Sequence, residues 1–314
     1  MSYRTHLPQL GGELFLTDGG LETTLIFHEG WSLPDFAAFH LLQEPGGEAA
    51  LRNYFLTYAA IAHRFKAGLI LESVTWRASA DWGTRLGYSR EALANANRKA
   101  IHLLEGVRRE VENAQTKVVI SGCIGPRGDG YIPTHVMSAQ AAKAYHAEQI
   151  DAFAETAADM VCALTLNYAE EAIGIARAAE HAGMPVAISF TVEADGKLPS
   201  GQNLKAAIEQ VDEATAGYPC YYMINCAHPS HFDHVLAMDE AFIQRIQGLR
   251  ANASRMSHAE LNEAPELDAG DPVALGQEYA ELKQRLPRLN VIGGCCGTDH
   301  RHVEQMAQAC SPLF

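Results

Sequence analysis

Short, almost continuous apolar runs alternate along this chain with longer segments in which apolar residues recur at helical spacing. Such runs are typical of strands that are buried on both faces of a parallel sheet. They predict eight strands, at residues 14–18, 69–75, 117–123, 160–165, 185–192, 221–226, 246–251 and 289–294.

The segments between these runs predict helices, most clearly at residues 90–113, 139–157 and 168–182. Eight strands, each followed by a helix-length segment, predict a (β/α)8 TIM barrel, an α/β fold, as a single domain over residues 1–314. An open doubly wound sheet is the alternative, but the segment that starts at Asp18 lacks the usual glycine-rich turn. Residues 251–272 are acidic and helix-poor, and we expect them to form a long loop after strand 7, at the catalytic end.

The charge balance narrows the possible partners. Lys and Arg number 24 against 38 Asp and Glu, a formal net charge of -14, which argues against nucleic acid and anionic membranes. No apolar run approaches the roughly 20 residues that span a bilayer, and the first residues lack a signal-peptide profile. We therefore expect a cytoplasmic enzyme whose seven cysteines serve as thiols or metal ligands.

Three cysteines follow predicted strands. Cys226 ends the sixth strand, and Cys295 and Cys296 follow the last one between glycines. The ends of parallel barrel strands share one mouth, where three thiolates would form a site suited to Zn²⁺ with its fourth position open. The alternatives are a disulfide within the vicinal pair, or packing as small apolar residues. Packing is our interpretation of the other four, Cys123, Cys162, Cys220 and Cys310.

Several motifs together resemble the homocysteine S-methyltransferase family. They are Gly-Gly-Cys-Cys-Gly-Thr at 293–298, Asn-Cys at 225–226, Asp-Gly-Gly at 18–20, Ser-Gly-Cys-Ile-Gly-Pro at 121–126 and Ser-Phe-Thr at 189–191. The resemblance runs from about residue 14 to residue 309. It implies a zinc-dependent TIM barrel in which Cys226, Cys295 and Cys296 hold the metal and Asp18 contacts the amino group of the thiol substrate.

The resemblance also implies an activity. A methyl group would pass from a small sulfonium donor, S-methylmethionine or S-adenosylmethionine, to homocysteine held at zinc as its thiolate, as in methionine biosynthesis. One alternative is a different thiol or selenol acceptor. Another is a subunit that works with a separate corrinoid methyl-carrier protein and docks it through residues 251–272, because the chain has no room for an appended cobalamin-binding domain.

Four further residues are candidates for substrate binding or ligand orientation. Asp18 ends the first strand, where it would face the mouth or cap a helix. Glu72 would lie buried in strand two and meet a substrate ammonium or a basic side chain. Trp76 would attract a cationic donor or pack beneath a helix. Asn225 precedes a metal ligand and would orient it or serve as a turn residue.

Two positions depart from the family pattern. Leu164 stands where the family usually has a Glu that contacts the amino acid substrate, and Glu22, Glu72 and Glu193 are the acids that could replace it. Arg77 stands where the family often has Gln. A fixed positive charge would repel a cationic donor, so we expect Arg77 to hold a substrate carboxylate.

A short histidine series follows Cys226. His228, His231 and His234 have i, i+3 spacing, which a metal site could use. Because Pro229 is typical of the first turn of a helix, we expect these residues to open a helix on the surface instead.

Overall fold

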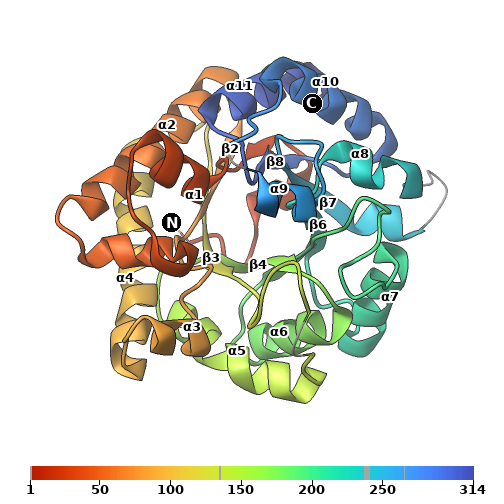
Figure 1. Ribbon diagram of the computed structural model, residues 1–314. Coiled ribbons are helices and arrows are strands. Elements are labelled where there is room, and N and C mark those ends of the chain that lie inside the picture. Colours follow the sequence, from red (N-terminus) through yellow and green to blue (C-terminus); the bar gives the residue numbers. More distant parts are fainter. Residues whose placement is uncertain (1, 134–135, 237–240, 265) are drawn as a thin grey trace.

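The structure is a computed structural model that describes residues 2–133, 136–236, 241–264 and 266–314. Eight parallel strands follow one another in chain order, and β8 pairs with β1 to close a barrel (Figure 1). This confirms the predicted (β/α)8 architecture, and every predicted strand overlaps an observed one. The strands are β1 Phe15–Leu16, β2 Gly68–Glu72, β3 Val118–Ile124, β4 Met160–Leu166, β5 Val186–Phe190, β6 Tyr221–Asn225, β7 Ile246–Ala251 and β8 Val291–Gly294.

Every strand residue is buried, because one face of the sheet fills the barrel and the other lies under the helices. The inner cluster includes Phe15, Ile70 and Met223. Cys123 and Cys162, paired between β3 and β4, belong to this cluster and are buried, as predicted for packing residues. Cys310 is buried in the outer cluster, whereas Cys220 is only partly buried.

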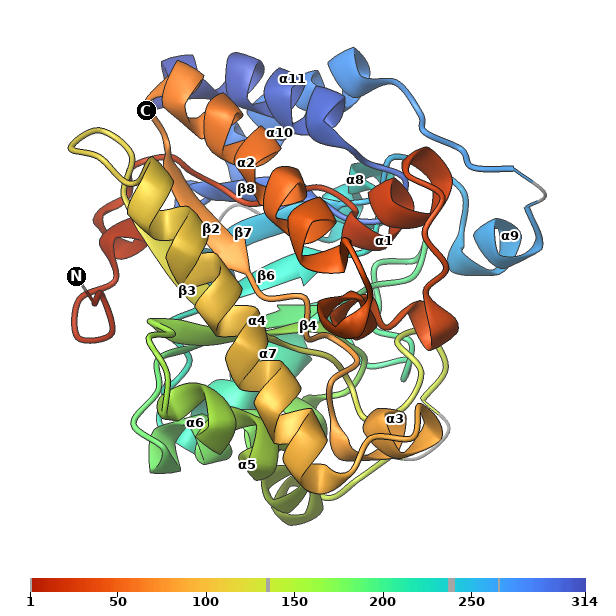
Figure 2. The same cartoon turned by 90° about the vertical axis from the view of Figure 1, so that its left-hand side faces the viewer.

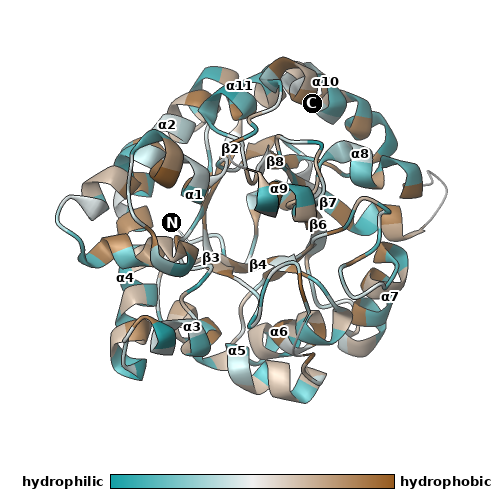
Figure 3. Ribbon diagram, viewed as in Figure 1, coloured by the Kyte–Doolittle hydropathy of each residue, from teal (hydrophilic) through white to brown (hydrophobic). Residues whose placement is uncertain are grey.

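An outer ring of helices covers the barrel, and hydrophilic and hydrophobic residues share their surfaces (Figure 3). Ser89 and Ser138 begin two of them by accepting hydrogen bonds from the backbone N–H groups of Ala92 and Ala141. The long helices are α2 Gly47–Phe65, α4 Arg90–Val111, α5 Ala139–Ala154, α6 Ala169–His181, α7 Leu204–Thr215, α10 Pro272–Arg285 and α11 His300–Cys310. The described part of the connection from β6 to β7 contains only α8 (Pro229–Phe232) and 3₁₀ turns.

The carboxyl ends of the strands open toward three short helices, α1 Leu21–Thr23, α3 Ala80–Arg85 and α9 His258–Glu263. Figure 2 shows these helices at one end of the barrel and both chain termini at the opposite end. The segment after β7 lies at the mouth, as expected. The prediction that it is poor in helix is wrong, because it contains α9, which Ser257 begins in a capping box with Glu260. Pro265 of this segment lies outside the described residues. None of the described helices has the length and apolar character to cross a membrane.

Candidate active site

A cavity of about 670 Å³ lies at the carboxyl ends of the strands. Its wall contains residues that follow β1, β2, β3, β6, β7 and β8, so it is the mouth of the barrel. The structure brings all the candidate residues of the sequence together here, namely Asp18, Glu72, Trp76, Asn225, Cys226, Cys295 and Cys296. Leu164 and Arg77, the two departures from the family pattern, line the same cavity.

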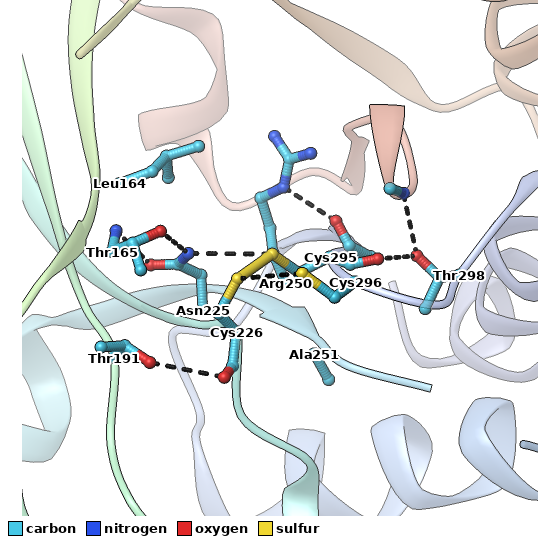
Figure 4. Close-up of a disulfide and its surroundings, with 12 residues drawn as sticks. Leu164, Thr165, Thr191, Asn225, Cys226, Arg250, Ala251, Cys295, Cys296 and Thr298 are labelled. Carbon is cyan, nitrogen blue, oxygen red and sulfur yellow. Dashed lines mark hydrogen bonds between the residues drawn. A yellow bond between two sulfur atoms is a disulfide. The ribbon is translucent and has the colours of Figure 1, made fainter. Parts of the chain in front are cut away.

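The three cysteine sulfur atoms lie within 4.8 Å of one another. The Sγ atoms of Cys226 and Cys296 are 3.8 Å apart, and Cys226 and Cys295 are joined in a disulfide (Figure 4). The disulfide therefore links the two strand ends, and not the vicinal pair that the sequence suggested as an alternative. Tetrahedral zinc with Zn–S bonds of about 2.3 Å places its sulfur ligands about 3.8 Å apart, so the three cysteines fit this metal once they are reduced.

The backbone around the cysteines is closely packed. Cys226 has a φ of 54°, in the left-handed region, where β6 ends. A Cβ atom at Gly294 would lie 2.0 Å from Oγ1 of Thr298, and one at Gly293 would lie 1.9 Å from Oγ1 of Thr17. These two glycines are thus required where β8 passes β1 and turns toward the cysteines.

Asn225 ties three strands together directly before Cys226. Its side-chain oxygen accepts hydrogen bonds from the backbone N–H of Thr165 (2.8 Å) and from the hydroxyl of Ser189 (2.6 Å). Its Nδ2 donates to Oγ1 of Thr165 (2.8 Å) and lies 3.9 Å from Sγ of Cys295 (Figure 4). The amide thus ties the end of β6, directly before Cys226, to β4 and β5, and its orienting role stays a prediction.

Asp18 is buried two residues after β1, and each of its carboxylate oxygens accepts a hydrogen bond from the protein. Arg250 on β7 donates to its Oδ1 at 2.6 Å, and the hydroxyl of Tyr54 on α2 donates to its Oδ2 at 2.9 Å. Arg250 was not predicted from the sequence, although an arginine inside an apolar strand was the available signal. Its charge balances that of Asp18, so this pair adds little net charge to the cavity.

Two carboxyl groups of the cavity, Glu22 on α1 and Glu72 on β2, form no ion pair within the described residues and have strongly shifted pKa values. Burial raises the pKa of each to about 7, although the positive charge of Arg250 opposes the shift. Oε2 of Glu72 is buried without a hydrogen-bond partner. Both acids are therefore close to the ionisation midpoint at neutral pH and can receive an ammonium group.

Trp76 follows β2 and is held on several sides. The guanidinium carbon of Arg77 lies 4.0 Å from a ring centroid of its indole, and its Nε1 donates to the carbonyl oxygen of Leu164 (3.3 Å). A Cβ atom at Gly125 would lie 2.8 Å from Cδ1 of Trp76, so the loop after β3 packs against it. One face of the indole thus already carries a cation.

Tyr131, in the loop after β3, and His258, at the start of α9, lie beside the cysteines, of which Cys296 is exposed. The hydroxyl of Tyr131 lies 3.8 Å from Sγ of Cys296, and its ring lies against that of His258 with centroids 4.2 Å apart. His258 also contacts the carbonyl oxygen of Cys226 and Oε1 of Glu193. Neither residue was predicted from the sequence, because no motif links segments that meet only in the folded barrel.

The histidine series lies elsewhere, and its placement corrects the prediction of a surface helix. His228 and His231 are buried, and α8 is only four residues long. Nε2 of His231 contacts the carbonyl oxygen of Arg255, and Nε2 of His228 lies 3.3 Å from Glu278. Within the described residues, the metal-ligating side chains that cluster are those of the three cysteines, and these histidines are not part of the cluster.

The family model for homocysteine S-methyltransferase matches residues 15–310 of the chain. The chain belongs to this family. Betaine–homocysteine S-methyltransferase 1 of Rattus norvegicus is 24% identical over 188 residues, which cover 54% of this chain and 44% of that relative. The match therefore spans less than half the length of that relative.

Solved structures of a homocysteine methyltransferase share the barrel fold of this chain. The oxidized form of the homocysteine methyltransferase MmuM from Escherichia coli superimposes with a TM-score of 0.73, and the metallated form with 0.72. Each comparison covers 95% of this chain and 96% of the MmuM chain, at 19% identity. At this identity, the likeness shows a shared barrel.

The resemblance to the family implies a Glu at the position that Leu164 occupies in this chain. Leu164 is buried with 8% exposure and lines the cavity. Of the three acids that could replace the missing carboxylate, Glu22 and Glu72 line the same cavity. Glu193 is not among the lining residues and instead pairs with His258 at 3.1 Å, which leaves the other two as the candidates.

Proposed function

We propose that this protein is a zinc-dependent S-methyltransferase that moves a methyl group from a small sulfonium donor, S-methylmethionine or S-adenosylmethionine, to homocysteine, giving methionine. The cluster of Cys226, Cys295 and Cys296 at the barrel mouth carries the proposal, together with membership of the family. The remaining residues of the cavity support it through their charge and position.

The donor set supports the choice of metal. In the reduced protein, Cys226, Cys295 and Cys296 would hold the ion, because three soft thiolates favour zinc over hard cations. Bound zinc supplies one property: it lowers the pKa of a coordinating thiol, so that the acceptor is a nucleophilic thiolate at neutral pH. As partners in a disulfide, Cys226 and Cys295 are not thiolates, and the activity therefore requires reducing conditions.

The other residues would position the two substrates. Glu22 and Glu72 would receive the ammonium group of the acceptor in place of the missing Glu at Leu164. Asp18, neutralised by Arg250, offers the same ammonium a hydrogen-bond acceptor at the edge of the cavity. Tyr131 lies 3.8 Å from Sγ of Cys296 and His258 contacts the carbonyl oxygen of Cys226, so both residues would help to position the substrates beside the cysteines.

The decisive experiment combines metal analysis with an assay of methyl transfer. Wild-type protein that is reduced and loaded with zinc should bind one equivalent and methylate L-homocysteine with S-methylmethionine or S-adenosylmethionine. The variant Cys296→Ser should lose most of the zinc and at least about 100-fold in activity, since removing one of few ligands is costly. Cys220→Ser is the matched control, because Cys220 is partly buried and lies outside the cavity. Full zinc content and full activity in Cys296→Ser would disprove the proposed site.

Leu164 supports a second candidate, methyl transfer to a thiol or selenol other than homocysteine. The apolar side chain occupies the cavity wall where an acid would bind the amino acid backbone of the acceptor. If another acceptor is used, the variant Leu164→Glu should create or raise activity with homocysteine by about tenfold or more. No change in that activity would count against this alternative.

A separate methyl-carrier protein is the remaining alternative, and the described residues offer no specific support for it. In that case the purified protein should transfer no methyl group from a free sulfonium. Activity would appear only after a methylated corrinoid protein is added.

A further inference from the structure

Arg77 is a buried cation in the wall of the cavity. Only 6% of its surface is exposed, and its guanidinium lies between two indole rings, 4.0 Å from a ring of Trp76 and 3.8 Å from a ring of Trp82. Burial lowers the pKa of Arg77 to about 10, so the group is still charged at neutral pH. The two rings stabilise its charge and fix the direction of its planar fork.

This guanidinium is not satisfied by the protein. Its Nη1 donates to the carbonyl oxygen of Gly128 at 3.0 Å, but its buried Nε has no hydrogen-bond partner. Asp129, Glu22 and Asp35 stabilise its charge from a distance, but within the described residues no carboxylate forms an ion pair with Arg77. Arg85 and Arg250, which line the same cavity, pair with Asp35 and Asp18. A buried charge that forms no ion pair costs folding free energy. The free position beside Arg77 therefore fits an anionic group that a bound ligand supplies.

We propose that Arg77 binds the carboxylate of one of the two substrates of the proposed methyl transfer. The inference rests on that proposed function and adds a requirement for substrate structure. A guanidinium presents its donors in a fork that matches a carboxylate, and both groups would be desolvated in the cavity. A substrate that carries this carboxylate would then bind much more tightly than the same molecule without it.

The same geometry restricts the donor. A sulfonium without an acidic group would meet the positive charge of Arg77, and the Trp76 face that could attract it is already covered by that guanidinium. A zwitterionic donor avoids this repulsion because its carboxylate neutralises Arg77. The carboxylate could instead belong to the acceptor, and the experiment below separates these two sources.

The test removes the charge from the protein and the carboxylate from each substrate in turn. The donor pair is S-methyl-L-methionine and (3-aminopropyl)dimethylsulfonium, and the acceptor pair is L-homocysteine and 3-aminopropane-1-thiol. The second member of each pair lacks only the carboxylate. Arg77→Gln and Arg77→Lys are compared with wild-type protein. The matched control is Arg127→Gln, since Arg127 lies 4.8 Å from the ring centroid of Tyr145 but pairs with Asp81 and is outside the cavity.

For the substrate whose carboxylate Arg77 binds, we expect Arg77→Gln to raise KM by about 30-fold to 100-fold with little change in kcat. KM for its partner without the carboxylate should change less than about threefold, and Arg77→Lys should recover part of the loss. A selective effect in the donor pair assigns the carboxylate to the donor, and one in the acceptor pair assigns it to the acceptor. Equal effects on both members of both pairs would show a structural role and overturn the proposal.

Binding measurements keep this test independent of turnover. Calorimetry with S-methyl-L-methionine and L-homocysteine, and with their analogues that lack the carboxylate, compares wild-type protein with Arg77→Gln. If no methyl transfer is found, the proposed function fails, but selective loss of binding would still support the carboxylate subsite. If neither carboxylate ligand binds the wild-type protein, or Arg77→Gln binds them as tightly, the proposal is wrong.

Discussion

Glu72 is an ionisable residue whose burial makes stability depend on pH. Burial raises its pKa from 4.5 to about 7 in the folded protein, so the folded state binds more protons than the unfolded state between these values. The carboxyl group therefore contributes stability that is present below pH 4.5 and is lost as the pH rises to about 7. At pH 8 the loss amounts to about 3 kcal/mol.

We therefore predict that Glu72→Gln raises the free energy of unfolding at pH 8 by up to about 3 kcal/mol, because the neutral amide avoids burial of the charge. The gain should be small at pH 5. Urea unfolding of the reduced protein at both pH values measures it, with the exposed Glu209→Gln as control. A variant that is destabilised equally at both pH values would show that the charge is not the cause.

The same variant also tests the binding role of Glu72. If the carboxylate receives the ammonium group of the acceptor, Glu72→Gln should raise KM for L-homocysteine by about tenfold or more. For the wild-type protein, KM should fall between pH 6 and pH 8, as the carboxyl group loses its proton through a pKa of about 7. Steady-state kinetics across this range check the prediction. A flat profile in the wild-type protein would assign the ammonium to another acid.

At the scale of the elements, the side chain of Asn225 holds the ends of β4, β5 and β6 together. The amide satisfies the backbone N–H of Thr165, the hydroxyl of Ser189 and Oγ1 of Thr165. Asn225→Ala should lower the free energy of unfolding by about 2–4 kcal/mol, because these buried groups lose their partner. Zinc affinity should fall as well, since Cys226 is the next residue. Unfolding measured without metal separates the loss of folding stability from the loss of zinc affinity. Asn95→Ala, on the exposed side of α4, is the control.

Contacts of His258 hold the loop that contains α9 in position. Its ring contacts Tyr131, the carbonyl oxygen of Cys226 and the carboxylate of Glu193. His258→Ala should therefore accelerate tryptic cleavage after the exposed Arg255 several-fold and raise KM for the substrates, while zinc content stays unchanged. His234→Ala is the control, because within the described residues its ring makes a single hydrogen-bond contact, with the carbonyl oxygen of Asp195. Unchanged cleavage in His258→Ala would mean that other contacts hold the loop.

At the scale of the whole molecule, the strands could be predicted and several side-chain partners could not. Strands buried on both faces leave apolar runs, and barrel closure brings their ends to one mouth, so Cys226 and Cys295 could be placed together from the sequence. The partner of Asp18 lies 232 residues away on β7, and only strand register brings Arg250 to it. Tyr131 meets His258 through two loops, which carry no periodic signal.

The cysteine cluster connects the ends of β6 and β8, so metal should act on the stability of the entire barrel. Zinc at 100 times its dissociation constant would add about 2.7 kcal/mol to the folded state, provided that the unfolded chain does not bind it. For a chain of 314 residues this corresponds to a rise in Tm of about 4 °C. Calorimetric melting of the reduced protein with zinc and with a chelator measures the shift. Cys296→Ser should show almost none, whereas Cys220→Ser should keep it. An equal shift in Cys296→Ser would place the stabilising ion away from the barrel mouth.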